Sequence, residues 1–229
     1  MLSLSHVTLK YRKKTILQDV SFDAAPGQTI GLLGMNGSGK STLLLSIAGV
    51  KKPAEGTILL EGKSYADDPR AYNSSVGFVT QENALIDELT AMDNLRLWTP
   101  MSKAEIFDTL QNTSLCALGV HTYLELPVNS MSGGMKKRLS LATVLINKPN
   151  VLLMDEPFAA LDLVAKKDIL NFLSLFRSGG GITVIASHDE KIFEFCDESY
   201  LLKDGVVTHL PQLAEKIKNG TDISELLRR

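Results

Sequence analysis

The sequence has little cysteine, no clear excess of either charge and no long apolar run. Its two cysteines, Cys116 and Cys196, lie far apart and form no CxxC pair, so neither a disulfide framework nor a zinc site is indicated, and two reduced core thiols are expected. The 24 basic and 26 acidic side chains nearly cancel, which leaves no long-range field that would draw the protein to nucleic acid or anionic lipid. No apolar run approaches the roughly 18 residues that span a bilayer, and the N-terminus lacks the order of a signal peptide. We therefore expect a cytoplasmic protein without a nucleic-acid partner.

Strand patterns of two kinds are present. Apolar and polar residues alternate over 7–11 and 20–24, which is typical of half-buried strands in an antiparallel sheet. Unbroken apolar runs at 30–33, 151–154 and 182–186 are typical of strands that are buried on both faces. The sequence thus predicts an α/β fold in which helices cover a parallel sheet and a β-rich edge lies near the N-terminus.

Helix signals replace the strand signals from Leu85 onward. Thr90 precedes the stretch AMDNLRLW, and Ser102 with Glu105 has the spacing of a capping box. We expect a helical subdomain at approximately 85–145 that is inserted into the α/β core.

The C-terminal part predicts smaller elements. The Asp204-Gly205 pair between SYLLK and VVTHL is typical of a tight hairpin, and a short helix is expected around LAEKIK. Because the sequence has no internal repeat, residues 1–229 are expected to form a single domain.

The strongest motif is GMNGSGKS at 34–41, which fits GxxxxGK followed by Ser or Thr. It lies between the apolar run TIGLL and the helix-like run STLLLSIAG, which is the order strand, loop, helix. Glycines let backbone N–H groups surround phosphate oxygens, Lys40 reaches the β- and γ-phosphates, and Ser41 can ligate Mg²⁺ at the positive end of a helix. The residues expected to contact a nucleotide are Gly34, Met35, Asn36, Gly37, Ser38, Gly39, Lys40, Ser41 and Thr42.

Two carboxylates, Asp155 and Glu156, follow the apolar run 151–154. Ligands collect at the exits of buried strands in open α/β sheets. Asp155 can hold the magnesium shell, and Glu156 can orient the water that attacks the γ-phosphate or accept its proton. A strand that ends in acid is common by itself, but its combination with the phosphate loop favours the catalytic interpretation.

A third motif, MSGGM, stands between the phosphate loop and the acidic strand and contains Ser132, Gly133 and Gly134. With these motifs in this order, the whole chain resembles an ABC transporter nucleotide-binding domain, in which the motif usually reads LSGGQ. The resemblance implies a P-loop NTPase fold with a RecA-like parallel-sheet core, an N-terminal antiparallel β subdomain and an inserted α-helical subdomain. It also implies an ATPase that uses Mg²⁺ and works as a head-to-tail dimer, in which each SGG helix covers the ATP on the partner's phosphate loop.

Single residues fit further positions of the family. Tyr11 fits the aromatic that stacks on adenine, although an ordinary strand tyrosine would look the same. Gln81 fits the glutamine that touches magnesium or the attacking water, Asp162 fits the loop that crosses the dimer interface, and His188 fits the histidine that bonds the γ-phosphate. The alternatives are a surface glutamine, a helix cap and a structural histidine. The resemblance thus implies a catalytic set of Glu156, His188, Lys40 and Gln81 and a metal set of Ser41, Gln81 and Asp155.

The chain departs from the family pattern at Met135, which cannot supply the amide of the usual glutamine. SGGM followed by basic residues resembles the exporters for drugs, lipids and glycans, and this slightly favours export over import. The basic run of Lys136, Lys137 and Arg138 is interpreted as a solvated helix face and not as a nucleic-acid patch.

Without a spanning segment, the chain needs a separate permease, and the resemblance places it at the inner face of the cell membrane. The expected docking site is a groove near Gln81 and the following NALIDELT segment.

The alternative is a soluble ABC ATPase that acts on nucleic acid, ribosomes or cluster assembly, but the chain has neither coiled coils nor a second ATPase copy. An inert scaffold is disfavoured because Lys40, Asp155, Glu156 and His188 are all present. The transported substrate, the permease and the choice between homodimer and heterodimer stay open.

Overall fold

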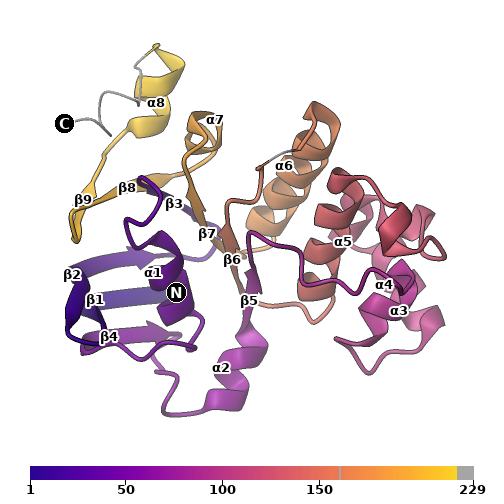
Figure 1. The fold of residues 1–229 in the computed structure, drawn as a ribbon, viewed down its shortest axis with the longest axis horizontal. Coiled ribbons are helices and arrows are strands. Elements are labelled where there is room, and N and C mark those ends of the chain that lie inside the picture. Colours follow the sequence, from indigo (N-terminus) through magenta and orange to yellow (C-terminus); the bar gives the residue numbers. More distant parts are fainter. Residues whose placement is uncertain (160, 221–229) are drawn as a thin grey trace.

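Two β-sheets and the helices around them make up the fold (Figure 1). The computed structural model describes residues 1–159 and 161–220, without the side chains of residues 190 and 191. The first sheet is antiparallel with the order β2-β1-β4, and its strands are β1 (Leu2–Tyr11), β2 (Lys14–Ala24) and β4 (Glu55–Leu60). The β1–β2 pair confirms the predicted β-rich edge, whereas the sequence analysis does not identify β4.

The second sheet is mainly parallel and has the order β5-β6-β7-β3-β8-β9. Asp204 and Gly205 both have positive φ angles, of 50° and 80°, in the tight turn before the last strand, which confirms the predicted hairpin. The strands are β3 (Thr29–Leu33), β5 (Val76–Val79), β6 (Val151–Asp155), β7 (Ile182–Ser187), β8 (Glu198–Lys203) and β9 (Val206–His209).

The central strands β3, β6 and β7 are parallel and end at the same edge of the sheet. Leu33 of β3 pairs with Ser187 of β7, and Asp155 of β6 pairs with Ala186 of β7. Every residue of the three strands is buried, as their unbroken apolar sequences predict. The register therefore brings the residues that follow these strands, Gly34, Glu156 and His188, to one place.

Helices cover both faces of the parallel sheet. On one face α1 (Lys40–Ile47) packs through Leu43 and Leu44 into a core that also holds Leu153 of β6. On the other face α5 (Gly133–Leu145) and α6 (Leu163–Ser178) share a second core with Leu152 of β6. Successive residues of β6 thus enter opposite cores, as the period of a strand requires. Short helices α2 (Pro69–Ser75), α7 (Glu190–Phe193) and α8 (Leu213–Lys218) complete the α/β part.

The segment between β5 and β6 is helical, as the sequence predicts. Thr90 caps α3 (Ala91–Arg96) by accepting from the Asp93 amide, and Ser102 with Glu105 forms a complete capping box at α4 (Lys103–Asn112). Three short 3₁₀ segments (Ser114–Leu118, Val120–Thr122 and Val128–Ser130) lead from α4 to α5. These helices are drawn from magenta to orange-red beside α5 in Figure 1. The single-domain assignment of 1–229 and the subdomain boundaries at 85 and 145 stay predictions.

The two cysteines differ in exposure. Cys196 is buried in the core and lies against the Ile192 carbonyl, and burial raises the pKa of its thiol. Cys116 is exposed in the first 3₁₀ segment, so the prediction of two core thiols is wrong for this residue. The segment turns Leu115 and Leu118 inward and leaves the cysteine between them at the surface.

Thiol labelling of the native protein checks this difference. Cys116 is expected to react rapidly with a disulfide reagent such as Ellman's reagent, whereas Cys196 is expected to react only after denaturation, because the thiolate is the reactive form and burial suppresses it. A Cys116→Ser variant should therefore show no fast thiol. Fast labelling of that variant would contradict the burial of Cys196.

Candidate active site

The loop between β3 and α1 is shaped by glycines, which stand where a side chain would collide or where φ is positive. A Cβ atom on Gly34 would lie 2.4 Å from Ser38 Oγ and 2.7 Å from the Leu202 carbonyl oxygen. Gly37 and Gly39 have φ angles of 81° and 104°, which favour glycine. Ser38 Oγ is buried and has no hydrogen-bond partner in the described part of the chain. A tight loop with free backbone at a helix N-terminus fits a phosphate group.

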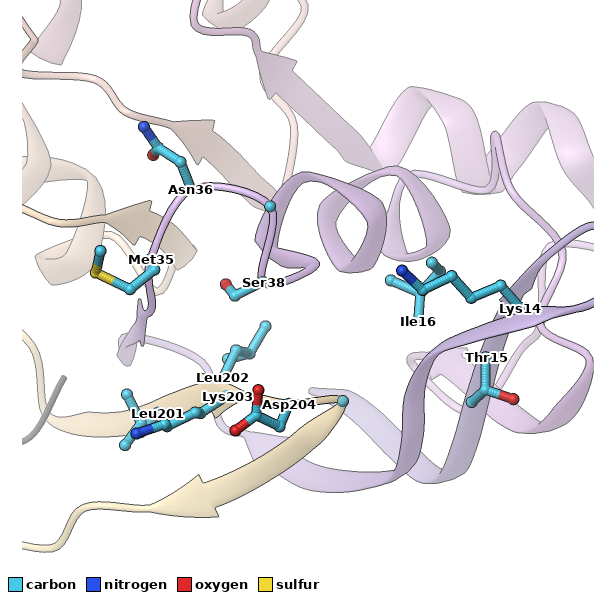
Figure 2. Close-up of a pocket in the computed structure, with 12 residues that line it drawn as sticks. Lys14, Thr15, Ile16, Met35, Asn36, Ser38, Leu201, Leu202, Lys203 and Asp204 are labelled. Carbon is cyan, nitrogen blue, oxygen red and sulfur yellow. The ribbon is translucent and has the colours of Figure 1, made fainter. Parts of the chain in front are cut away.

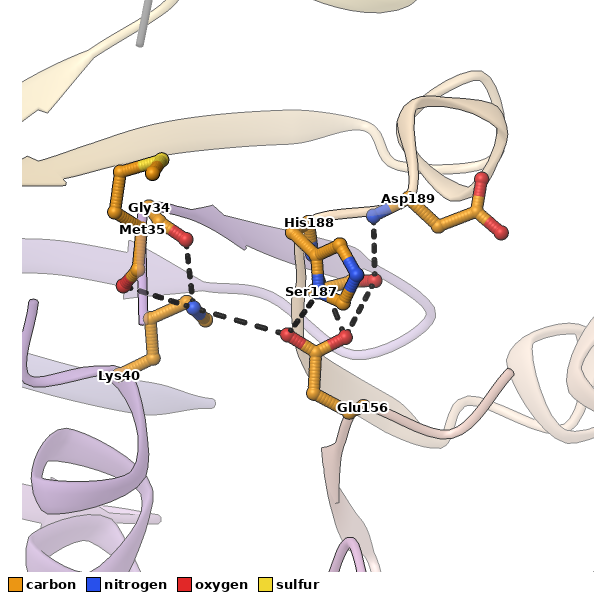
Figure 3. Close-up of polar contacts among 7 residues, drawn as sticks. All are labelled: Gly34, Met35, Lys40, Glu156, Ser187, His188 and Asp189. Carbon is orange, nitrogen blue, oxygen red and sulfur yellow. Dashed lines mark hydrogen bonds and ion pairs between the residues drawn. The ribbon is translucent and has the colours of Figure 1, made fainter. Parts of the chain in front are cut away.

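The Glu156 carboxylate is the centre of a buried polar network (Figure 3). Its Oε1 lies 3.7 Å from Lys40 Nζ and 2.8 Å from His188 Nδ1, while Oε2 accepts a hydrogen bond of 3.1 Å from the Ser187 hydroxyl. Lys40 Nζ also donates to the Gly34 carbonyl at 2.7 Å. The structure thus brings together three of the predicted catalytic residues, Lys40, Glu156 and His188.

Burial and strain set the properties of this network. The side chains of Lys40 and Glu156 are only 6% and 8% exposed. Burial lowers the pKa of the Lys40 ammonium, and the Glu156 and Asp155 carboxylates oppose this shift. Glu156 has a φ of 45°, a strained backbone state that costs about 1–3 kcal/mol and is found preferentially at functional sites. The strain turns the chain at the end of β6, where the Glu156 amide donates to the Ala186 carbonyl.

A cavity of about 530 Å³ lies between residues 35–38 of the loop, the start of β2 and the β8–β9 hairpin (Figure 2). Its lining includes Lys14, Asn36, Ser38 and Asp204. Tyr11 pairs with Lys14 at the end of β1 and is 62% exposed. Arg12 Cζ and Lys51 Nζ lie 5.8 Å and 5.5 Å from the centroid of its ring, so a base that stacked on the ring would have to displace one of these two cations.

Ser132, Gly133 and Gly134 form a second group with Asp162, away from the Lys40 network. Ser132 caps α5 by accepting from the Met135 amide at 3.3 Å, and Asp162 caps α6 by accepting from the Ala165 amide at 2.8 Å. A Cβ atom on Gly134 would lie 2.8 Å from the Ala165 Cβ, so this glycine lets the two helix starts approach closely. Ser132, Gly133 and Asp162 are exposed, as an interface would require.

The predicted magnesium ligands are oxygen donors. Asp155 ends β6 and is 8% exposed, Ser41 lies in the first turn of α1, and Gln81 follows β5 by two residues. Within the described ranges, no group of three His, Cys, Asp or Glu side chains could hold a metal ion. One carboxylate with neutral oxygens nevertheless fits Mg²⁺, which keeps waters and takes further ligands from substrate phosphates.

Lys137 contradicts the interpretation of the basic run as a solvated face. It is 4% exposed, and its amine donates to the Thr80 carbonyl at 2.9 Å and to the Gln81 carbonyl at 3.3 Å. Burial lowers the pKa of Lys137 to about 8, and the charge of Asp155 opposes this shift. Its neighbour Lys136 pairs instead with Asp87 at 2.9 Å, near the surface. Helix periodicity turns only one of the adjacent lysines toward β5.

Sequence reasoning misses Ser187 as well as Lys137. Ser187 ends β7 and holds the Glu156 carboxylate, while its hydroxyl accepts from the Asp189 amide at 3.0 Å. Its place directly before His188 at the end of a buried strand is a signal that was available in the sequence. Lys166 Nζ of α6 also pairs with Asp189 Oδ2 at 3.0 Å, which ties the helix after Asp162 to the strand end that carries His188.

Fold and site together define a P-loop nucleotide-binding protein, and comparison with known proteins identifies its family. The ABC transporter family model matches residues 17–159. The chain therefore belongs to the ABC transporter family, as an ATP-binding subunit and an ATPase. This confirms the resemblance and the predicted fold class.

Curated relatives align over most of the chain. A putative ABC transporter ATP-binding protein of Listeria monocytogenes is 36% identical over 90% of this chain and 80% of its own length. The cytochrome c biogenesis ATP-binding export protein CcmA of Wolbachia pipientis is 32% identical over 86% of this chain and 93% of its own. The spermidine/putrescine import ATP-binding protein PotA of Spiroplasma citri is 33% identical over 94% of this chain, which spans only 62% of that relative.

Among solved structures, the ATP-binding cassette MJ0796, a dimer bound to ADP and Pi, is similar to this chain with a TM-score of 0.77 and 29% sequence identity. The match covers 92% of this chain and 98% of the MJ0796 chain. An ATP-binding subunit of an ABC transporter has a TM-score of 0.85 and 26% identity, with 99% and 97% coverage. Within the described residues, no helix is long and apolar enough to cross a membrane.

A Gly34→Ala substitution tests the geometry of the loop. Because the new methyl group would collide with a backbone carbonyl, ATP affinity is expected to fall tenfold or more, about 1.4 kcal/mol, in equilibrium binding. Gly179→Ala is the matched control, since its Cβ would make only ordinary contacts of 3.5 Å or more. Wild-type affinity in Gly34→Ala would contradict the packing of the loop.

Proposed function

We propose that this chain binds ATP with Mg²⁺ at the loop 34–42 and hydrolyses it in a head-to-tail dimer to drive transport through a separate permease. The observation that carries the proposal is the buried Glu156 carboxylate, held between the ammonium of the loop lysine and the His188 ring. Phosphoryl transfer needs little covalent chemistry from the protein, so positioned charge of this kind supplies most of the catalysis.

Each residue of the network has a distinct proposed task. Lys40 neutralises the β- and γ-phosphates, and Glu156 orients the attacking water and takes its proton. The Ser187 hydroxyl fixes one carboxylate oxygen, which leaves the other directed at Lys40 and His188. Mg²⁺, held by Ser41, Asp155 and Gln81, would offset the phosphate charge. Tyr11 stacks on the base at the turn between β1 and β2.

The dimer is proposed because the chain carries two separate nucleotide-contacting groups. The exposed N-terminus of α5 presents Ser132 and Gly133 with the positive end of a helix, on the opposite side of the parallel sheet from α1. A second subunit in head-to-tail orientation would bring this group to the phosphate loop of the first. The dimeric MJ0796 cassette supports the arrangement.

The permease is proposed to dock in a groove of about 540 Å³ between β5 and α5. Its lining includes Phe78, Thr80, Ala84 and Trp98, and it adjoins the NALIDELT segment. Trp98 is 53% exposed, which leaves an aromatic ring available for a partner. Docking there would hold the chain at the inner face of the membrane.

Export is the proposed direction, and it rests on the SGGM sequence. Relatives bear names of both directions, since CcmA is named as an export protein and PotA as an import protein. Transport assays on the reconstituted complex distinguish the two.

Glu156→Gln tests the catalytic assignment. The amide keeps the shape of the side chain but cannot take a proton, so hydrolysis is expected to fall roughly a hundredfold or more while ATP remains bound. The variant should then run as a dimer in size-exclusion chromatography with ATP and Mg²⁺. Lys40→Ala is the control that should lose ATP binding instead. A monomeric Glu156→Gln protein, or hydrolysis at the unmodified rate, would contradict the proposal.

Trp98→Ala tests the docking groove. Removal of the exposed ring is expected to weaken association with the purified permease about tenfold, while ATP hydrolysis by the isolated chain stays unchanged. Phe107→Ala is the matched control, because this ring is 43% exposed on α4 and does not line the groove. Asp87 is a poorer probe, since its reversal would break the pair with Lys136. Equal affinities of the two variants would argue against the groove.

A further inference from the structure

The buried ammonium of Lys137 is unusual because its described hydrogen bonds go to uncharged partners. Its neighbours in α5 pair with carboxylates, Lys136 with Asp87 and Arg138 with Asp168. Lys137 Nζ instead donates to two backbone carbonyls, at 2.9 Å and 3.3 Å. The Asp155 carboxylate attracts this ammonium but forms no described ion pair with it, so burial of the charge still costs stability that an apolar side chain of similar size would avoid. Packing alone therefore gives no reason for a lysine at this place.

The two carbonyls belong to Thr80 and Gln81, which directly follow β5. Gln81 has an exposed side chain, so its direction depends on how the backbone is held. Lys137 holds that backbone from one turn inside α5, the helix that Ser132 caps. One ammonium thus connects the β5 exit to the helix whose start is proposed to contact the partner's nucleotide.

We propose that Lys137 is a positioning residue for ATP hydrolysis, which holds the Thr80–Gln81 backbone against α5 so that the Gln81 side chain reaches the active site. The inference rests on the proposed function, in which Gln81 contacts magnesium or the attacking water. Because Thr80 also lines the groove with Ser140 of α5, the same link joins the groove wall to the hydrolytic site. A displacement of about 1 Å at such a group can reduce the rate about a hundredfold.

Lys137→Met removes the donors and keeps the length of the side chain. The kcat of the full-length protein is expected to fall roughly tenfold to a hundredfold, with the KM for ATP changed less than about twofold, because the loop that binds the phosphates is untouched. Lys137→Gln retains an amide that can donate to a carbonyl, and it should recover part of the kcat. Lys136→Met is the matched control and should hydrolyse ATP at the wild-type rate.

A double-mutant cycle separates positioning from general stability. If Lys137 acts through Gln81, then Lys137→Met should lower the kcat of a Gln81→Ala protein by less than about twofold. Full additivity in the cycle, or a kcat of Lys137→Met within twofold of wild type, would overturn the proposal. Should Lys137→Met not fold, the same cycle with Lys137→Ala, which also removes the donors, decides by the same criteria. Absence of hydrolysis in the wild-type protein would instead refute the proposed function.

Discussion

The buried contact between the Lys40 ammonium and the Glu156 carboxylate depends on the register of three parallel strands. Lys40 begins the helix after β3, Glu156 follows β6, and Ser187 ends β7, so a slip of one residue in either pairing would separate them. Both charges are nearly inaccessible to water, and the attraction between them offsets part of the cost of burying each one. The apolar strands are therefore the means by which residues far apart in sequence form one site.

This arrangement also explains why the two groups proposed to contact one nucleotide, the Lys40 network and the start of α5, come from different subunits. The Lys40 network lies where β3, β6 and β7 end, and α1 covers one face of the parallel sheet, while α5 and α6 cover the other. No movement within a well-packed sheet can bring a helix start from one face to the other. A second subunit satisfies the geometry, and the link between Lys166 and Asp189 gives the α6 side a contact with the strand that carries His188.

The parts predicted from the sequence are those in which local pattern and tertiary environment agree. Strands β3, β6 and β7 read as apolar runs because both of their faces are buried, and the loop before Lys40 is fixed by glycine chemistry. Strand β4 is not predicted because its sequence, EGTILL, shows no clear alternation of apolar and polar residues. Cys116 was misjudged because exposure within a short 3₁₀ segment depends on which of its residues face the core.

Lys137 shows a harder limit of composition-based reasoning. The run KKR suggests a solvated face, yet Gly134, Lys137 and Ser140 recur at intervals of three along α5 and are all buried. The spacing is visible in the sequence, but a charged residue ordinarily marks the exposed side of a helix. The burial of Lys137 depends on hydrogen bonds to two backbone carbonyls that follow β5, and no local sequence pattern reveals these carbonyls. A lysine in the buried row of a helix, when the adjacent lysine has its own carboxylate partner, therefore indicates a polar contact across the core.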